Sequence, residues 1–158
     1  MVEELTAMIN AAYAAGEEGM WRPDTPRVFA AEVRGLLDAG ELVVVRRDGA
    51  LAGCVRVHAL DAATGELGLL SAVRRDSGIG SELVALAEGG ARERGLARMR
   101  LKLLVPRTGT HPFKARLHAW YCKLGYRVIA RQDFADALPE SARLLTAPCD
   151  LVIYEKAL

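Results

Sequence analysis

The stretch from residue 66 to residue 95 constrains the fold of this chain more than any other. Residues 66–73 form an apolar, strand-like run, a short loop with Gly78 and Gly80 follows, and a helical pattern continues to about Gly95. Residues 99–105 alternate between apolar and polar side chains, which is the pattern of another strand. A helix that connects two strands of one sheet packs back on that sheet, so this stretch predicts a crossover helix between parallel strands.

The predicted helix over residues 79–95 contains two adjacent glycines. Its apolar side includes Leu83 and Val84, and Gly89 and Gly90 follow a few residues later. An exposed glycine inside a helix costs about 1 kcal/mol relative to alanine. We therefore interpret the pair as a sign of close packing against the sheet.

Three strand-like segments precede this helix. Residues 41–46 are rich in β-branched side chains, Asp48-Gly49 is a hairpin turn signal, and residues 51–58 form the returning partner. A second turn over residues 61–65 leads into the strand over residues 66–73. The spacing predicts a three-stranded antiparallel meander.

Two helices are predicted before the meander. Residues 3–15 carry apolar side chains at helical spacing. In the second helix we expect Thr25 to be the N-cap, Pro26 to take the first helical position and Asp38 to lie near the end. The expected apolar face of that helix is formed by Phe29, Val33, Leu36 and Leu37.

The remaining segments follow residue 106. A helix is predicted over residues 113–124, with Gly125 just past its end, and strands are predicted over residues 126–130 and 151–154. The connection over residues 133–148 is rich in turn residues. The expected inward side chains of the helix are Phe113, Leu117, Trp120, Tyr121 and Leu124. The whole pattern predicts an α+β fold with a mixed sheet.

Length and charge exclude several classes of protein. The 158 residues suit one domain, and we expect a single domain over residues 1–158. Lys and Arg number 21 against 20 Asp and Glu, a net charge of +1, which argues against a nucleic-acid partner. The longest run without charge extends from Leu5 to Gly16, shorter than the roughly 18 apolar residues of a membrane span.

The N-terminal residues and the cysteines predict a location in a reducing compartment. The first residues, Met-Val-Glu-Glu, are acidic where a secretory signal would be basic. Cys54, Cys122 and Cys149 are far apart and form no C-x-x-C pair, so neither a disulfide framework nor a zinc knuckle is expected. We interpret all three as buried small hydrophobic residues in a cytoplasmic protein.

The loop between residues 74 and 80 has the chemistry of an anion site. A glycine-containing turn from a strand into a helix start presents free backbone N–H groups, which the helix dipole makes attractive to a phosphate. Arg74 and Arg75 add positive charge, and Ser77 and Ser81 offer hydroxyls. The alternative is an ordinary tight turn. The loop is not a P-loop, because G-x-x-x-x-G-K-[ST] is absent.

Two motifs give this chain a family resemblance. Residues 75–80, Arg-Asp-Ser-Gly-Ile-Gly, fit R-x-x-G-x-G, the acyl-CoA pyrophosphate loop of the GNAT family of N-acetyltransferases. Residues 66–73 resemble the cofactor-binding strand of that family. Residues 120–126, Trp-Tyr-Cys-Lys-Leu-Gly-Tyr, resemble its second signature, a helix end with an aromatic residue and tyrosine that runs into a strand. The order of elements matches over residues 26–130.

The resemblance implies the acyl-CoA N-acyltransferase fold, a central mixed sheet of about six strands with helices on both faces. It implies acetyl-CoA as the acyl donor, with no metal. The pantetheine arm would bond to the backbone of the cofactor-binding strand, and the pyrophosphate would lie on the loop and helix start. The implied cofactor residues are Leu70, Ser71, Ala72, Val73, Arg75, Asp76, Ser77, Gly78, Ile79, Gly80, Ser81 and Lys114.

The resemblance also implies the catalytic groups. Tyr121 occupies the position of the general acid that protonates the CoA thiolate, and the alternative is a core aromatic residue. Glu66 is the leading base for the attacking amine, against a carboxylate that only makes a hydrogen bond, or proton loss through water. His111 and His118 are further alternatives, either as bases or as solvated or capping groups, and His58 has the weakest case.

The chain departs from the family pattern in four respects. The segment between Val73 and Gly78 is a few residues shorter than in most relatives, and no proline follows the strand. Lys114 stands where the family usually has asparagine, and either reaches a CoA phosphate or merely solvates the helix. Leu117 replaces a common alanine.

The implied reaction is transfer of an acetyl group to the primary amine of a small molecule. The alternatives are acetylation of a protein or peptide amine, a catalytically silent acyl-CoA-binding module, and a fold that anchors another nucleotide. The acceptor site would be framed by Tyr13, Trp21 and Arg22 with residues 106–112 and 133–148. A homodimer is expected from family habit, with the strand over residues 151–154 as a possible pairing edge.

Overall fold

The computed structural model describes all residues, 1–158, and contains a six-stranded sheet in the order β1-β2-β3-β4-β6-β5. The chain divides into two compact units. The first unit consists of residues 1–14, 26–99 and 157–158. The second unit consists of residues 15–25 and 100–156. The expected α+β class with a mixed sheet of six strands is confirmed.

The first unit holds the predicted meander and its helices. β1 pairs with β2 and β2 pairs with β3, both antiparallel. Asp48 and Gly49 both have positive φ, 52° and 80°, as the predicted two-residue hairpin turn requires. The elements of this unit are α1 (Val2–Gly16, whose last residues belong to the second unit), α2 (Ala30–Asp38), β1 (Leu42–Arg47), β2 (Ala50–Ala59), β3 (Thr64–Ala72) and α3 (Ile79–Glu93).

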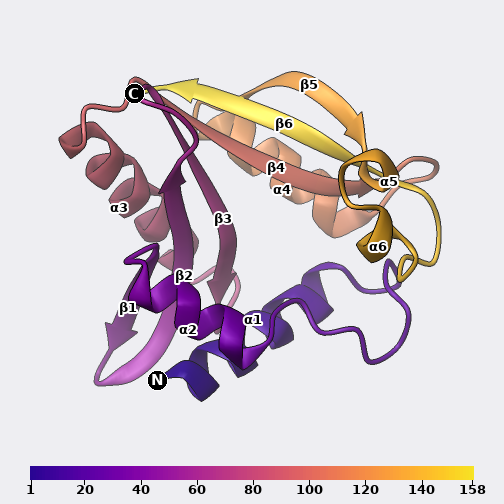
Figure 1. The fold of residues 1–158 in the computed structure, drawn as a ribbon, viewed down its shortest axis with the longest axis horizontal. Helices are drawn as coiled ribbons and strands as arrows, with labels where there is room; N and C mark the ends of the chain where they lie inside the picture. The colour runs from indigo at the N-terminus through magenta and orange to yellow at the C-terminus, as the bar shows by residue number, and fades with distance from the viewer. The chain divides into compact units, whose positions relative to one another are not determined.

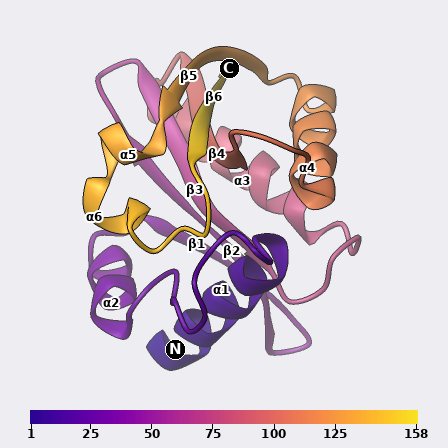
Figure 2. The same cartoon turned by 90° about the vertical axis from the view of Figure 1, so that its right-hand side faces the viewer.

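In the first unit, α1 and α2 cover one face of β1–β3 and α3 covers the other (Figures 1 and 2). Cys54 of β2 faces the apolar cluster that α1 and α2 contribute, which includes Leu5 and Val33. Neighbouring residues of a strand face opposite sides, so Gly53 faces α3. A Cβ atom on Gly53 would lie 2.7 Å from Ile79 Cγ2. Gly53 is therefore the glycine that lets α3 approach the sheet.

The close-packing interpretation of Gly89 and Gly90 is wrong. A Cβ atom at either position would meet nothing within 4 Å. The sequence signal for a close approach lay in the strand, where Gly53 has no room for a side chain, and not in the helix.

The predicted start of α2 is also wrong. Thr25 Oγ1 donates to the carbonyl of Arg22 at 2.6 Å and caps no helix, and Phe29, expected on the apolar face, is 67% exposed. The reason is a contact with α1. Asn10 Oδ1 accepts the backbone N–H groups of Arg27 and Val28, which holds this segment extended and delays the helix to Ala30.

The second unit contains three strands and three helices. α4 lies on one side of the strands and the short helices α5 and α6 lie on the other (Figure 2). These two helices occupy the connection for which only turns were predicted. The elements are β4 (Arg98–Pro106, whose first residues belong to the first unit), α4 (Pro112–Lys123), β5 (Arg127–Asp133), α5 (Phe134–Ala137), α6 (Pro139–Ala142) and β6 (Cys149–Ala157).

The last strand is not an edge. β6 lies between β4 and β5 and pairs antiparallel with β5, so β1 and β5 are the edge strands. The expectation that residues 151–154 offer a pairing edge is therefore wrong. The sequence shows that this segment is a strand, but its place in the sheet depends on its partners.

Two of the three cysteines are buried as expected. Cys54 and Cys149 are buried, whereas Cys122 is exposed, which corrects the prediction for that residue. Cys122 follows the buried Tyr121 in α4 and lies on the outward side of the helix. None of the helices has the length and apolar character needed to cross a membrane.

Candidate functional site

A backbone irregularity interrupts β3. The register of β2 and β3 shifts between the Cys54–Ser71 and Arg56–Gly68 pairs, so β3 holds one extra residue. Leu69 adopts a φ of 50°, a left-handed conformation that is costly for a branched residue. Its carbonyl accepts the hydroxyl of Ser71 at 3.0 Å. Bulges of this kind redirect a strand and are frequent next to binding sites.

The loop that follows β3 leaves the start of α3 open. Gly78 is the N-cap residue of α3, has a φ of 82° and carries no capping side chain. A side chain at that φ would be strained, so glycine is needed there for its backbone. Residues 73–78 are exposed, while Ile79 is buried and anchors the helix against Gly53. The first N–H groups of a helix lack partners within it, so this exposed end can accept an anion.

The charges at the start of α3 favour an anion. Glu82 in the first turn forms a salt bridge with Arg47 of β1, which offsets the negative charge of Glu82. Arg74 and Arg75 are exposed in the loop. Ser77 Oγ donates to the carbonyl of Arg74 at 2.7 Å and closes the turn. The predicted pyrophosphate residues thus lie together in one loop and helix start.

The strand that was predicted to bind the pantetheine arm already uses part of its backbone to pair with β2. The N–H of Val73 donates to the carbonyl of Ala52 at 2.9 Å, so this donor is not available to a ligand. Ser71 and Ala72 pair with Cys54 and Gly53 across β2. A role for Leu70, Ser71 and Ala72 in holding a cofactor stays a prediction.

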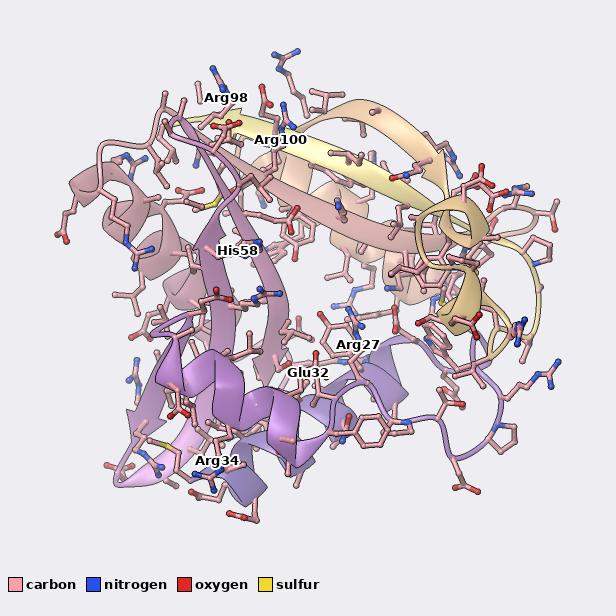
Figure 3. The ribbon with its side chains drawn as sticks, in the orientation of Figure 1. Arg27, Glu32, Arg34, His58, Arg98 and Arg100 are labelled. Atoms are coloured by element: carbon pink, nitrogen blue, oxygen red, sulfur yellow. The ribbon has the colours of Figure 1, made fainter.

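Glu66, the predicted base, lies directly opposite His58 on the neighbouring strand. The two residues are cross-strand partners, and Glu66 Oε1 is 3.7 Å from His58 Nε2. Figure 3 marks His58 on β2. Both side chains are mostly buried, 22% and 18% exposed for His58 and Glu66. The predicted base therefore has an imidazole beside it, that of His58, which had the weakest case of the three histidines in the sequence.

Tyr121, the predicted acid, lies in the second unit and is 6% exposed. Its ring packs against three aromatic rings with centroid distances of 4.9 to 6.0 Å, those of Trp120, Tyr126 and Tyr154. This packing fixes the position of the ring, which a proton donor requires. It is equally what a core residue shows, so the catalytic role stays a prediction.

Lys114 does not lie on the surface. Its Nζ is 2.8 Å from Glu17 Oε2, and the two side chains are only 6% and 5% exposed. Trp21 Nε1 donates to the other Glu17 oxygen at 2.9 Å. The interpretation of Lys114 as a solvating residue is therefore wrong, because burial and pairing remove it from water. The ion pair instead ties the chain after α1 to the first turn of α4.

His111 caps the same helix. Its Nδ1 accepts the N–H of Lys114 at 3.4 Å, and Pro112 follows as the first helical residue. His111 Nε2 lies 3.1 Å from the carbonyl of Glu18. The expectation of a capping group is confirmed for this histidine. The start of α4 is closed by its own side chains.

A cavity of about 450 Å³ lies within the second unit. Its wall includes Arg22, Arg107 and parts of the segments over residues 133–135 and 142–149. These are the segments that were predicted to frame an acceptor site. Trp21 packs edge-on against Phe134 in the adjacent core, and Tyr13 belongs to the first unit.

Four charges form a network beside this cavity. Arg107 is 2.8 Å from Asp133 and 3.0 Å from Asp150, and Arg131 is 2.8 Å from Asp150. Hydrogen bonds from Arg131 and then Arg107 hold the pKa of Asp150 below its ordinary value. The two carboxylates balance the two guanidinium groups. The wall also includes Arg22 and the mostly exposed Arg143, which is 3.5 Å from Glu140.

The sequence profile of the acetyltransferase (GNAT) family matches residues 5–126. The chain belongs to this family. The match runs from the first turn of α1 to just past the end of α4 and includes the loop at the start of α3 and Tyr121. A search of curated protein sequences finds no match.

Solved structures of GNAT proteins share the fold. A GNAT family acetyltransferase from Elizabethkingia anophelis with acetyl-CoA bound is 16% identical, with a TM-score of 0.65 over 81% of this chain and 82% of the other. An aminoglycoside 6'-N-acetyltransferase complexed with coenzyme A is 17% identical, with a TM-score of 0.72 over 99% and 89%. A ribosomal-protein-alanine N-acetyltransferase from Brucella melitensis is 21% identical, with a TM-score of 0.66 over 100% and 96%.

Several features of this GNAT chain were not predicted from its sequence. The bulge at Leu69 had only Gly68 as a weak local signal. Glu17 and Tyr154 had none, because their partners are remote in sequence. In the described structure, no group of three or more His, Cys, Asp or Glu residues could hold a metal ion.

Proposed function

We propose that this chain is an N-acetyltransferase that moves the acetyl group of acetyl-CoA to the primary amine of a small molecule. The observation that carries the proposal is the open N-terminus of α3, with its left-handed Gly78, in a chain that belongs to the GNAT family. An exposed, uncapped helix start beside two arginines suits the pyrophosphate of CoA. Single-domain organisation over residues 1–158 is part of the proposal.

The proposal also assigns the cofactor residues. In the proposal, the backbone N–H groups of residues 76–81 hold the pyrophosphate, Arg75 adds charge, and the backbone of residues 70–72 bonds to the pantetheine arm. Lys114 supports the cofactor site through its position in α4 and not through a direct contact of its ammonium group, because Glu17 already binds that group. The bulge at Leu69 supports a cofactor role for β3, since it redirects the strand just before the predicted pantetheine residues.

The proposed chemistry is direct attack. The neutral amine forms the new C–N bond at the thioester carbonyl, and the C–S bond breaks. Glu66, with His58 beside it, takes the proton that the amine loses. Tyr121 donates a proton to the departing CoA thiolate, which supports collapse toward products.

The proposed acceptor is a small molecule that fits the cavity of the second unit. A volume of about 450 Å³ is in the range of small-ligand pockets, which run from roughly 300 to 1,000 Å³. Its lining combines apolar residues such as Leu145 and Pro148 with Arg22 and Arg143. Acetylation of a protein amine is the second candidate, and the fold similarity to a ribosomal-protein-alanine N-acetyltransferase favours it.

The decisive experiment is mass spectrometry of acetyl-CoA reactions with pooled small amines and with peptides. The expected result is a mass gain of one acetyl group on a small amine, together with free CoA. Products found only on peptides would move the assignment to a protein acetyltransferase. CoA binding in calorimetry without any acetylated product would establish a silent acyl-CoA-binding module.

A variant pair tests the acid. Tyr121→Phe is expected to lower kcat by about a hundredfold, because the thiolate loses its proton donor. Tyr126→Phe is the matched control, since Tyr126 is also buried in the same aromatic group. Equal rates in both variants would remove Tyr121 from the mechanism.

Location and assembly complete the proposal. A cytoplasmic location is supported by three free cysteines, which include the exposed Cys122. A homodimer rests on the family resemblance alone, since β6 is an interior strand.

A further inference from the structure

The outer side of α4 carries a thiol and an imidazole that the proposed acetyl transfer does not use. His118 and Cys122 are one helical turn apart and therefore lie on the same side of the helix. Cys122 Sγ is 3.7 Å from His118 Nε2, within hydrogen-bond reach for sulfur. Both residues are exposed, so a reagent in solution can reach the pair.

A buried tyrosine holds the other side of the imidazole. The hydroxyl of Tyr154 lies 2.7 Å from His118 Nδ1, and Tyr154 is 1% exposed. Burial, with a smaller effect of Cys122, raises the pKa of Tyr154 to about 12, so its hydroxyl stays neutral. When Nδ1–H donates to the Tyr154 oxygen, the Nε2 lone pair faces the Cys122 thiol. This is the order of a nucleophile, a base and an orienting group.

The other two thiols lack these conditions. Cys54 is 0% exposed, and burial raises its pKa to about 12. Cys149 is 3% exposed, and its pKa is raised by burial and by Glu17. Because the thiolate is the reactive form, both are poor nucleophiles.

We propose that Cys122 is a site of covalent thiol modification by small disulfides, with His118 as the proton acceptor and Tyr154 as the positioning residue. The Cys122 thiol proton moves to His118 Nε2. The thiolate then attacks one sulfur of the disulfide, a new S–S bond forms to Cys122 and the original S–S bond breaks. The departing thiolate takes up a proton from His118 or water. One disulfide is consumed and one thiol is released, so no other oxidant is needed.

The test uses the full chain with dithiobisnitrobenzoate and with glutathione disulfide as probes. Release of the coloured thiolate gives the rate, and intact-mass and peptide mass spectrometry give the site. We expect one thiol to react first, at Cys122, and the product to be reversed by dithiothreitol. First modification at Cys54 or Cys149 would overturn the proposal.

Three variants separate the role of the thiol from that of the base. Cys122→Ser is expected to remove the fast reaction while leaving acetyl transfer unchanged. His118→Gln is expected to slow it about tenfold, because the thiol loses the base that accepts its proton. Lys123→Gln is the matched control: it removes a neighbouring positive charge without removing the base, and should change the rate less than about twofold. An unchanged rate in His118→Gln would contradict the base role.

The rate of reaction with dithiobisnitrobenzoate in Tyr154→Phe tests Tyr154. Tyr154→Phe keeps the ring and its packing but removes the oxygen that holds His118. The rate is expected to fall in Tyr154→Phe as in His118→Gln, and the double variant is expected to be no slower than His118→Gln, because Tyr154 acts through the imidazole. Rates that coincide with the unmodified chain in both single variants would show that the thiol is merely accessible.

Discussion

The two longest helices that follow the meander begin in opposite ways. α3 starts at Gly78, a left-handed residue without a capping side chain, in an exposed loop. α4 starts at His111, whose imidazole accepts a backbone N–H, and its first turn holds the buried Lys114 paired with Glu17. Both helices have the same orphan N–H groups and the same dipole. A helix start can serve an anion only where side chains of the chain itself have not already closed it.

The largest expected effect on the free energy of unfolding comes from the start of α4, where Lys114 pairs with Glu17. Lys114→Met leaves Glu17 buried without its cation, and breaking such a pair costs about 3–5 kcal/mol of unfolding free energy. Denaturant unfolding measures the loss. The double variant Lys114→Met with Glu17→Leu removes both charges and should recover most of it. A single variant that loses less than about 1 kcal/mol would show that the start of α4 does not depend on this pair.

The second effect concerns how α3 reaches the sheet. Gly53→Ala places a Cβ atom 2.7 Å from Ile79 Cγ2 and from the Ser71 carbonyl, so a loss of about 1–3 kcal/mol is expected from overpacking. Gly90→Ala is the control within the helix, where nothing lies within 4 Å, and it should be stabilising by up to about 1 kcal/mol. Midpoints of thermal unfolding that shift in opposite directions in the two variants would confirm that Gly53 of the strand, and not Gly90 of the helix, sets how closely α3 approaches the sheet.

The third prediction tests the open start itself. Gly78→Ala strains a φ of 82° and should cost about 1–2 kcal/mol of stability, with weaker CoA binding as well. Gly95→Ala, with a φ of 79° past the other end of α3, should cost the same stability without affecting CoA. Calorimetric titration with CoA separates the two variants. Equal CoA affinities would remove the start of α3 from the cofactor site.

The smallest effect is expected for the cap of α4. His111→Ala removes the acceptor for the Lys114 N–H, and loss of a cap costs about 0.5–1 kcal/mol. His111→Asn keeps a capping oxygen and should recover most of that loss, although it removes the contact with the Glu18 carbonyl. If alanine and asparagine are equally destabilising, the contact with Glu18, and not the cap, is what the imidazole contributes.

Local signals predicted the elements well. The hairpin at Asp48-Gly49, the meander, the helix after Gly78 and the end of α4 at Gly125 all follow from neighbouring residues, and the structure confirms them. The prediction of where α2 starts was wrong because Asn10, far earlier in the chain, holds residues 27 and 28 extended. The prediction that the last strand lies at an edge was wrong for a similar reason, since its pairing with β5 depends on residues outside the strand.

The candidate site divides along the same line. Its backbone part, the loop over residues 74–80, was visible because glycine spacing reports directly on backbone conformation. The burial and the partners of side chains were not visible. Lys114 read as a surface lysine, His58 ranked last among the histidines, and Tyr154 read as an ordinary strand residue, because each is defined by a partner on another element.

The sequence by itself determined the type and order of most elements, the open glycine loop and the membership in the GNAT family, because periodicity, turn residues and short motifs act over a few neighbouring positions. Only the tertiary structure decided which charges are buried, which glycine is crowded and which cysteine has a base beside it. These properties arise from contacts between residues tens of positions apart, and a folded core imposes them through excluded volume and the cost of burying an unpaired charge.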